Sequence, residues 1–278
     1  MKMFKKVFAV LLALMILASL GTLSYADNSG LNRPVIVNAG SLNIRQSPDE
    51  NATRISGATL GTELFALESV TSNGTEWYKV QFTNADGKTQ TGYVMADLVT
   101  LVKDIGMVTS GALNVRATAS TSATRIGGLS QGDGVYILDE TEAEGATWYR
   151  ILYGIVPAYV QANYVGKMST PESSADADYK KDVTAIVKCY NVPKNYKIVV
   201  DGNSVISTGQ AEISIARSLG QLTESKTVSF RAYDTAGNLV AYNDLAVVVD
   251  DNIFARISAF FRFIFSGFKW GSQTVTLD

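Results

Sequence analysis

The sequence contains no histidine and only one cysteine in 278 residues. Histidine is the side chain that titrates near neutral pH, and Ser-His-Asp triads, Cys-His pairs and His-based zinc sites all depend on it. None of these sites can be built from this sequence. The lone cysteine, Cys189, excludes a disulfide within the chain, so hydrophobic cores must hold the fold together. We expect Cys189 to be a small buried residue, because a nucleophilic thiol would need a base.

Charge is sparse as well: charged residues make up 18% of the chain, and the formal net charge is −2. This balance makes nucleic acid an unfavourable partner. The acidic residues are scattered over polar, turn-like stretches, which is typical of solvated surface rather than of paired general acids and bases. We therefore predict that the protein is not an enzyme, has no metal site and no cofactor, and binds no nucleic acid.

The N-terminal stretch combines a basic start with an apolar run. Three lysines lie within the first six residues, the run covers residues 7–20, and small residues follow up to Ala26. This order is typical of a secretory signal peptide, so we expect residues 1–26 to be removed and the protein to be secreted and extracellular. The alternative is an uncleaved anchor, although the run is shorter than the ~20 residues that a span needs. Removal of the three lysines leaves a more acidic chain.

Hydrophobic residues are plentiful, at 46% of the chain, and they occur in a repeated pattern. The motif LNIR at 42–45 recurs as LNVR at 113–116. In the same ungapped frame ATRI at 52–55 falls on 123–126, and Trp77-Tyr78 falls on Trp148-Tyr149. We infer an internal duplication of about 65 residues.

Each copy is composed of short stretches with apolar residues at every second position. In the first copy these stretches are EWYKVQF from Glu76 and TGYVMADLV from Thr91, with Asn-Gly at 73–74 and Asp-Gly at 86–87 as turn signals. Alternation of this kind between turn signals predicts antiparallel β-strands. We therefore predict two small all-β barrels, at residues 35–100 and 106–167.

The landmarks of each copy resemble the bacterial SH3 domain family (SH3b), which occurs in secreted, cell-wall-associated proteins. The order is L-N-[IV]-R, a glycine-containing turn, a W-Y-[KR]-[VI] strand and a G-Y-V-x-x-x-[LY]-V ending. The resemblance implies non-catalytic recognition of peptidoglycan or another envelope ligand. Two departures are local: the family usually has tryptophan where Tyr93 and Tyr159 stand, and Ala158 replaces a usual glycine. We expect the second copy to be the more altered one.

The repeated LN[IV]R motif is expected to be mainly scaffold. Its apolar residues alternate toward a core, and Arg45 and Arg116 are expected to donate to backbone carbonyls of the following loop. Of two adjacent aromatic residues in a strand, only one faces inward, so the other is expected to be exposed and to line a groove. The candidate ligand-binding residues are Asn43, Trp77, Tyr78, Tyr93, Asn114, Trp148, Tyr149 and Tyr159.

The C-terminal part begins with a segment rich in Ser, Ala and Asp at 168–182, which is expected to be a linker. Strands around Asp-Gly-Asn at 201–203 and Ala-Gly-Asn at 236–238 then predict a small antiparallel β-sandwich at 183–250. The stretch FRAYDTAGNLV at 230–240 resembles a hairpin of bacterial immunoglobulin-like domains, which usually act as spacers or adhesive modules.

Residues 252–278 predict an aromatic amphipathic helix and a terminal strand. Asn252 is the expected N-cap, and Ser266-Gly267 is the expected stop. The residues leave two interpretations open: the helix packs on the sandwich, or it contacts a membrane surface as a peripheral anchor. The candidate membrane-contact residues are Phe260, Phe261, Arg262 and Phe265.

Taken together, these patterns predict an all-β, secreted, non-catalytic envelope protein whose tandem SH3b barrels bind peptidoglycan or another cell-wall polymer. The short stretch between the barrels is expected to restrict their relative orientation, which would let two weak sites reinforce each other. The alternative is an extracellular interaction or adhesion protein. Its barrels would serve as spacers or bind envelope proteins, and its C-terminal part would contact another surface.

Overall fold

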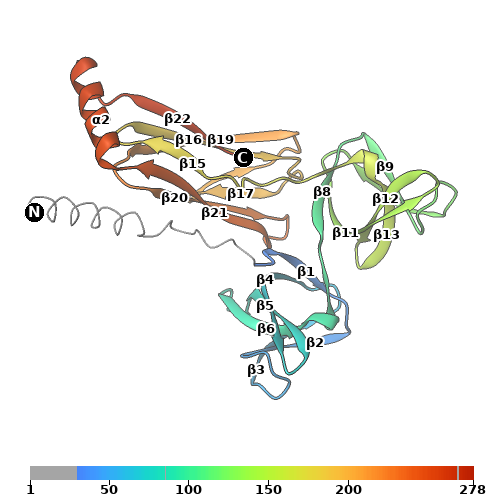
Figure 1. Cartoon of the computed structure of the whole chain (residues 1–278). Helices are drawn as coiled ribbons and strands as arrows, with labels where there is room; N and C mark the ends of the chain where they lie inside the picture. Colours follow the sequence, from blue (N-terminus) through green and yellow to red (C-terminus); the bar gives the residue numbers. More distant parts are fainter. Residues whose placement is uncertain (1–29, 85, 268) are drawn as a thin grey trace, which may run out of the picture. The chain divides into compact units, whose positions relative to one another are not determined.

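A computed structural model describes residues 30–84, 86–267 and 269–278, so the expected signal peptide at 1–26 lies outside the described residues. Strands dominate the described chain, and the segment Leu31–Asp278 forms one compact unit (Figure 1). The all-β prediction is confirmed. Two barrels are followed by a two-sheet sandwich and, near the C-terminus, by the one α-helix of the described residues.

Barrel 1 is one seven-stranded sheet with the order β3-β2-β6-β5-β4-β1-β7. Its core contains the apolar residues of the alternating stretches, among them Leu42, Ile44 and Val80. The turn between β4 and β5 has positive φ at Asn73 and Gly74, as a tight hairpin turn requires. The strands are β1 (Arg33–Val37), β2 (Ser41–Arg45), β3 (Arg54–Thr59), β4 (Glu63–Ser72), β5 (Thr75–Thr83), β6 (Thr89–Met95) and β7 (Val99–Leu101).

Barrel 2 repeats this arrangement with the order β10-β9-β13-β12-β11-β8-β14. Its core holds Leu113, Val115 and Ile151, the counterparts of the barrel 1 residues. Only residues 102 and 103 separate the last strand of barrel 1 from the first strand of barrel 2. The strands are β8 (Asp104–Val108), β9 (Ala112–Arg116), β10 (Arg125–Ser130), β11 (Gly134–Ala143), β12 (Ala146–Tyr153), β13 (Val156–Gln161) and β14 (Val165–Lys167).

The C-terminal module is a sandwich of a five-stranded sheet, β15-β21-β20-β17-β18, and a three-stranded sheet, β19-β16-β22. Phe230, Ile198 and Leu245 fill the space between them, and the same cluster contains Cys189. Burial raises the pKa of the Cys189 thiol to about 12, so this residue is the buried one that we expected. The strands are β15 (Ala175–Asp178), β16 (Asp182–Tyr190), β17 (Lys197–Val200), β18 (Asn203–Ile206), β19 (Glu212–Gln221), β20 (Lys226–Tyr233), β21 (Leu239–Asp250) and β22 (Ser272–Leu277).

The sandwich differs from the prediction at two edges. Residues 168–182, expected as a linker, contain β15, which pairs in parallel with β21, and Ala177 within it is buried. The terminal strand β22 likewise pairs in parallel with β16. Both parallel pairs are made by strands from segments that flank the predicted sandwich. The terminal strand was predicted, but β15 was not, because its sequence ADAD has little strand propensity and is stabilised by pairing with β21.

The helix α2 (Ile253–Phe265) begins and ends where the sequence predicted. The side chain of Asn252 accepts a hydrogen bond from the Ala255 amide at 2.9 Å, and Gly267 follows the helix with φ of 70°. Such a cap satisfies one of the free amides at a helix N-terminus. No helix within the described residues is long and apolar enough to cross a membrane.

Candidate functional site

The candidate aromatic residues divide between the two faces of one strand in each barrel. In β12, Tyr149 and Ile151 point to the core, whereas Trp148 and Arg150 lie on the opposite face. In β5, Tyr78 and Val80 are the residues that face the core of barrel 1. The inward partner of each Trp-Tyr pair is therefore the tyrosine.

The opposite face does not leave the tryptophans exposed, which is a difference from the sequence-based expectation. Trp77 and Trp148 are each only 1% exposed, and Tyr149 is 8% exposed. The Trp148 indole N–H donates to the Ala143 carbonyl at 3.2 Å, which fixes the ring. Alternation predicts which side of a strand a residue takes, but it does not predict whether that side is exposed.

A polar cavity of about 190 Å³ lies in barrel 2, and Trp148 is one of the residues that line it. Asn114 projects into it from β9, Gln161 from the end of β13, and Tyr164 from the short turn Ala162–Tyr164. Asn114 is exposed and makes no side-chain hydrogen bond within the described chain, so its amide is available to a ligand. The complete lining is Ala112, Leu113, Asn114, Arg116, Thr121, Trp148, Gln161 and Tyr164.

The loop between β9 and β10 forms one wall of this cavity, and two side chains hold it. Arg116 donates to the Ala123 carbonyl at 2.8 Å, as the scaffold interpretation predicted. From the opposite hairpin, the Glu144 carboxylate accepts the Thr121 amide and hydroxyl, each at 2.9 Å, and the Ser120 hydroxyl. These hydrogen bonds hold the pKa of Glu144 below its usual value, and the one from Ser120 has the largest effect. The cavity wall is thus positioned before any ligand arrives.

Barrel 1 keeps the loop lock but not the polar cavity lining. Arg45 donates to the Ala52 carbonyl at 2.7 Å, just as Arg116 does in barrel 2. However, the positions of Gln161 and Tyr164 are occupied by Met95 and Leu98, and that of Thr121 by Glu50. Asn43 is exposed at the place of Asn114 and makes no side-chain hydrogen bond in the part of the chain that the structure describes. The hydrogen-bonding capacity therefore lies mainly in barrel 2.

The remaining candidates lie beside these groups rather than in the cavity. Tyr93 is half-buried opposite Arg45 and Lys79, and Tyr159 is half-buried opposite Arg116 and Arg150. In barrel 1, Tyr78 lines a separate, larger hollow of about 450 Å³ together with Glu76 and Asp97. The structure thus brings Asn114 and Trp148 together and leaves the other predicted tyrosines outside that cavity.

Sequence reasoning missed three residues of the barrel 2 cavity: Thr121, Gln161 and Tyr164. The only available signal was the contrast between the copies. Gln161 and Tyr164 are polar where the first copy has Met95 and Leu98. Thr121 reaches the cavity through a loop conformation that no periodic pattern describes.

A second polar cluster joins the three modules. The Tyr136 hydroxyl of barrel 2 donates to Glu63 Oε1 of barrel 1 at 2.7 Å and lies 3.3 Å from Asp234 Oδ2 of the sandwich. Burial, together with the nearby Asp234 carboxylate, raises the pKa of Glu63 to about 7, although the Tyr136 hydrogen bond opposes this shift. Apolar contacts accompany the cluster: Ile36 and Leu138 of the barrels belong to a hydrophobic cluster that continues into the sandwich.

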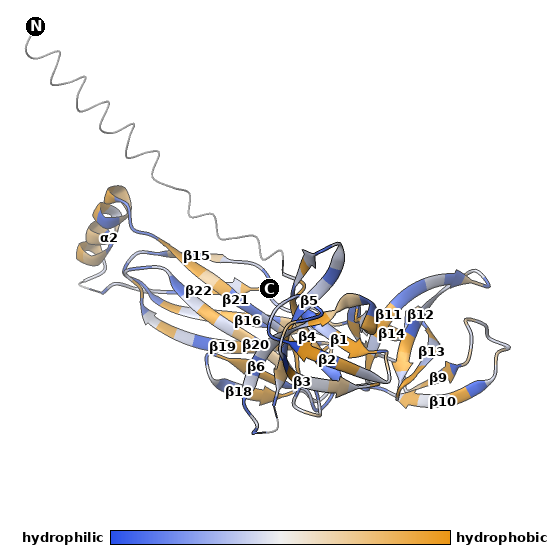
Figure 2. Ribbon diagram, turned by 90° about the horizontal axis from the view of Figure 1, so that it is seen from below, coloured by the Kyte–Doolittle hydropathy of each residue, from blue (hydrophilic) through white to orange (hydrophobic). Residues whose placement is uncertain are grey.

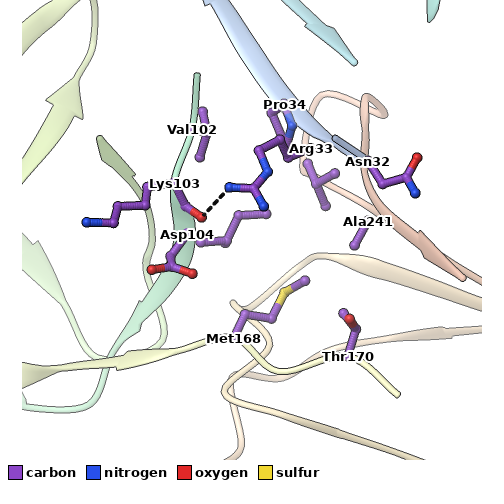
Figure 3. A pocket seen from close by; sticks show the side chains of 11 residues that line it. Asn32, Arg33, Pro34, Val102, Lys103, Asp104, Met168, Thr170 and Ala241 are labelled. Carbon is purple, nitrogen blue, oxygen red and sulfur yellow. Dashed lines mark hydrogen bonds between the residues drawn. The ribbon is translucent and has the colours of Figure 1, made fainter. Parts of the chain in front are cut away.

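A small cavity of about 140 Å³ lies nearby, where the connecting segments meet (Figure 3). Arg33 donates to the Lys103 carbonyl at 3.4 Å across it, and Met168 and Ala241 line its other side. Its walls come from strands of all three modules and from the segments that connect them. We therefore assign this space to packing at the seam rather than to ligand binding. No group of three potential metal ligands occurs among the residues described.

The fold defines a class of protein: a tandem pair of SH3-like barrels followed by a β-sandwich. Residues 40–100 and 111–166 both match the bacterial SH3 domain family, so the chain carries two bacterial SH3 domains in tandem. Domains of this family often bind cell-wall polymers, and the chain is accordingly a cell-wall-related protein.

Comparison with whole proteins adds little. No curated protein matches the sequence. Among solved structures, NlpC1 from Trichomonas vaginalis is 11% identical, with 80% of this chain and 90% of that chain covered and a TM-score of 0.23. NlpC2 from the same organism is 12% identical, with coverage of 79% and 94% and a TM-score of 0.22. We draw no conclusion from similarities at this level.

Proposed function

We propose that the chain is a secreted, extracellular, non-catalytic protein associated with the cell wall, and that it binds peptidoglycan or another wall polymer through its tandem SH3 modules. The observation that carries the proposal is the preformed cavity of barrel 2, whose lining includes the polar residues Asn114, Gln161 and Tyr164. A cavity lined by uncharged polar side chains suits the amide and hydroxyl groups of a peptide or glycan.

Charge supports hydrogen bonding and stacking as the binding mode. Barrel 1 carries seven acidic and four basic residues between positions 35 and 100, so attraction to an anionic polymer is not its mechanism. In barrel 2, the cation nearest the cavity, Arg116, already donates to the Ala123 carbonyl. We expect retention on the wall to depend only weakly on salt.

The test is a pull-down of residues 31–278 on purified peptidoglycan. The double variant Asn114→Ala with Gln161→Ala should lower retention by about tenfold or more, since each lost hydrogen bond contributes about 1 kcal/mol. The tryptophans are unsuitable targets, because each is 1% exposed and its truncation would perturb the core. The matched control is Asn43→Ala in barrel 1, which should reduce retention less.

The alternative function is an interaction or adhesion protein whose barrels act as spacers. The hydrophobic cluster that continues from the barrels into the sandwich favours this role. No retention of the unmodified protein on peptidoglycan, with capture of an envelope protein that survives the Asn114 and Gln161 substitutions, would support it. Release of soluble fragments from peptidoglycan by the purified protein would contradict the non-catalytic proposal.

We also propose peripheral contact with a membrane through the C-terminal helix. The supporting observation is that the candidates Phe260, Phe261 and Phe265 are exposed on α2, whereas Arg262 is half-buried on its inner side. Residues 31–278 should therefore float with lipid vesicles. Substitution of Phe260, Phe261 and Phe265 by glutamine, which leaves the core strand β22 in place, should abolish flotation.

A further inference from the structure

The helix α2 is oriented with its apolar side away from the protein. Its inner side consists of Ala255, Ala259, Arg262 and Phe263, and only Ala259 is fully buried. Figure 2 shows the helix with hydrophobic residues along its length. A helix packed for its own stability would turn these residues to the core. The large exposed apolar residues of α2 are Ile253, Phe254, Ile257, Phe260, Phe261, Ile264 and Phe265.

Specific contacts hold the helix in this orientation. Arg262 donates to the Tyr179 carbonyl at 3.2 Å and forms an ion pair with Asp178 at 3.4 Å. Phe263 stacks on Trp270 with ring centroids 4.2 Å apart. The inner side of α2 therefore contacts the sandwich through specific interactions. These interactions hold the apolar side of the helix toward solvent.

The exposed side chains form one continuous strip that fits a flat surface. At about 100° per residue, all seven fall within about 140° of the helix circumference, and Phe254, Phe261 and Phe265 fall within about 40°. The two most exposed, Phe254 at 79% and Phe265 at 84%, lie near opposite ends of the helix. Since about 16 Å separates these ends, the strip meets a surface along its length and not at its tip.

Cations and aromatic residues lie beside the helix, next to Phe263 and Arg262 and after its C-terminus. Between Asn252 and Gly271 the sequence has three cations, Arg256, Arg262 and Lys269, and no carboxylate. The Lys180 ammonium lies 4.6 Å from the centroid of the Trp270 ring and 5.7 Å from that of Tyr179. Trp and Tyr are the side chains that favour the boundary between lipid and water.

From this arrangement we propose that α2 lies flat on an anionic lipid surface, with its phenylalanines in the acyl boundary and Lys180 and Lys269 at the lipid phosphates. The proposal rests on the peripheral membrane contact proposed above and adds a headgroup chemistry and an orientation. Arg256 already forms an ion pair with Asp251, and Asp178 forms ion pairs with both Lys181 and Arg262. Lys180 and Lys269, in contrast, form no ion pair within the described residues.

The experiment is vesicle flotation of residues 31–278, which form one compact unit. One set of vesicles is phosphatidylcholine alone, and the other is an equal mixture of phosphatidylcholine and phosphatidylglycerol. Binding to the anionic set should be about tenfold tighter or more, because each cation near such a surface contributes about 1 kcal/mol. Lys180→Gln with Lys269→Gln should remove that preference and leave binding to the neutral set unchanged.

The apolar strip is tested separately. Phe254→Gln with Phe261→Gln should weaken binding to both vesicle sets by about tenfold or more, since each buried phenylalanine contributes about 1.5–3 kcal/mol. The matched control is Ile206→Gln, at an exposed apolar residue of the distant strand β18, which should change nothing. The fold of each variant is checked by its thermal unfolding.

The outcomes separate the two proposals. Equal binding to both vesicle sets would overturn the anionic headgroup assignment and keep the peripheral membrane contact. Binding to neither set would overturn both, whereas retention on peptidoglycan would remain a separate result. A lipid-free dimer that the Phe254 and Phe261 substitutions dissociate would identify a second copy of the chain as the occupant and overturn the lipid proposal.

Discussion

The two arginines of the repeated motif show how one side chain organises a binding loop. Arg45 and Arg116 each donate to a carbonyl seven residues further along the chain, at 2.7 and 2.8 Å. A charged donor to a backbone carbonyl is stronger than a neutral one, and its loss leaves a part-buried carbonyl without its partner. The motif therefore shapes the loop without contacting a ligand itself.

Substitution of Arg116 by methionine, which keeps the length of the side chain, should lower the free energy of unfolding by about 1–3 kcal/mol. It should also increase amide hydrogen exchange across residues 117–124 and reduce retention on peptidoglycan. Arg45→Met is the matched control: a similar loss of stability is expected, with a smaller loss of retention. Unchanged exchange in residues 117–124 would contradict the role of Arg116 as a lock.

At the level of the element, α2 is a short helix that depends on its cap. Isolated helices of this length are marginal in water, and this one buries little of its own apolar surface. The bond from the Ala255 amide to the Asn252 side chain thus accounts for a large share of the order in the first turn.

Asn252→Ala should destabilise the first turn of α2 by about 1 kcal/mol, because the Ala255 amide loses its acceptor. Hydrogen exchange of residues 253–257 should rise, and cleavage by trypsin after Arg256 should become faster. Asn252→Asp retains an acceptor oxygen and should behave like the unmodified chain. If residues 253–257 of the alanine variant were as well protected from hydrogen exchange as those of the unmodified chain, packing and not the cap would hold the helix.

The elements also show what sequence can and cannot reveal. Alternation and turn residues located the barrels, the hairpin at Asp201-Gly202 and the helix cap, because these features are encoded locally. The strand β15 was missed, since its residues ADAD carry no strand propensity and are held by pairing with β21. In the candidate site, Trp148 was found but its burial was not, because alternation gives the side of a strand and not how far the rest of the fold covers that side.

At the level of the whole molecule, one protonation site lies where all three modules meet. The Glu63 carboxyl, hydrogen-bonded to Tyr136 and close to Asp234, has a pKa raised to about 7. Because the pKa is higher in the folded state than the ordinary 4.5, folding favours the protonated form. The stabilisation is complete below pH 4.5 and is lost as the pH rises toward 7.

The unfolding free energy of residues 31–278 should accordingly fall between pH 4.5 and pH 7, by about 2–3 kcal/mol from this group alone. Glu63→Gln keeps the shape of the side chain and cannot ionise, so its stability should change much less over this window. Glu68→Gln, at an exposed ion pair with Lys79, is the control and should keep the pH dependence. Urea titrations at pH 5 and pH 8 measure the difference. If the unfolding free energy of the Glu63 variant fell by as much as that of the unmodified chain, the assignment would be contradicted.

The strand β15 has a mechanical consequence for a protein held at both ends. It enters the sandwich directly from barrel 2, and it runs parallel to β21, which leads into α2. A pull on the barrels and an opposite pull on α2 act on opposite ends of this pair, so the load is sheared across all of its hydrogen bonds at once. In an antiparallel pair loaded through the same segments, both forces would act at one end of the pair, and its hydrogen bonds would break one after another.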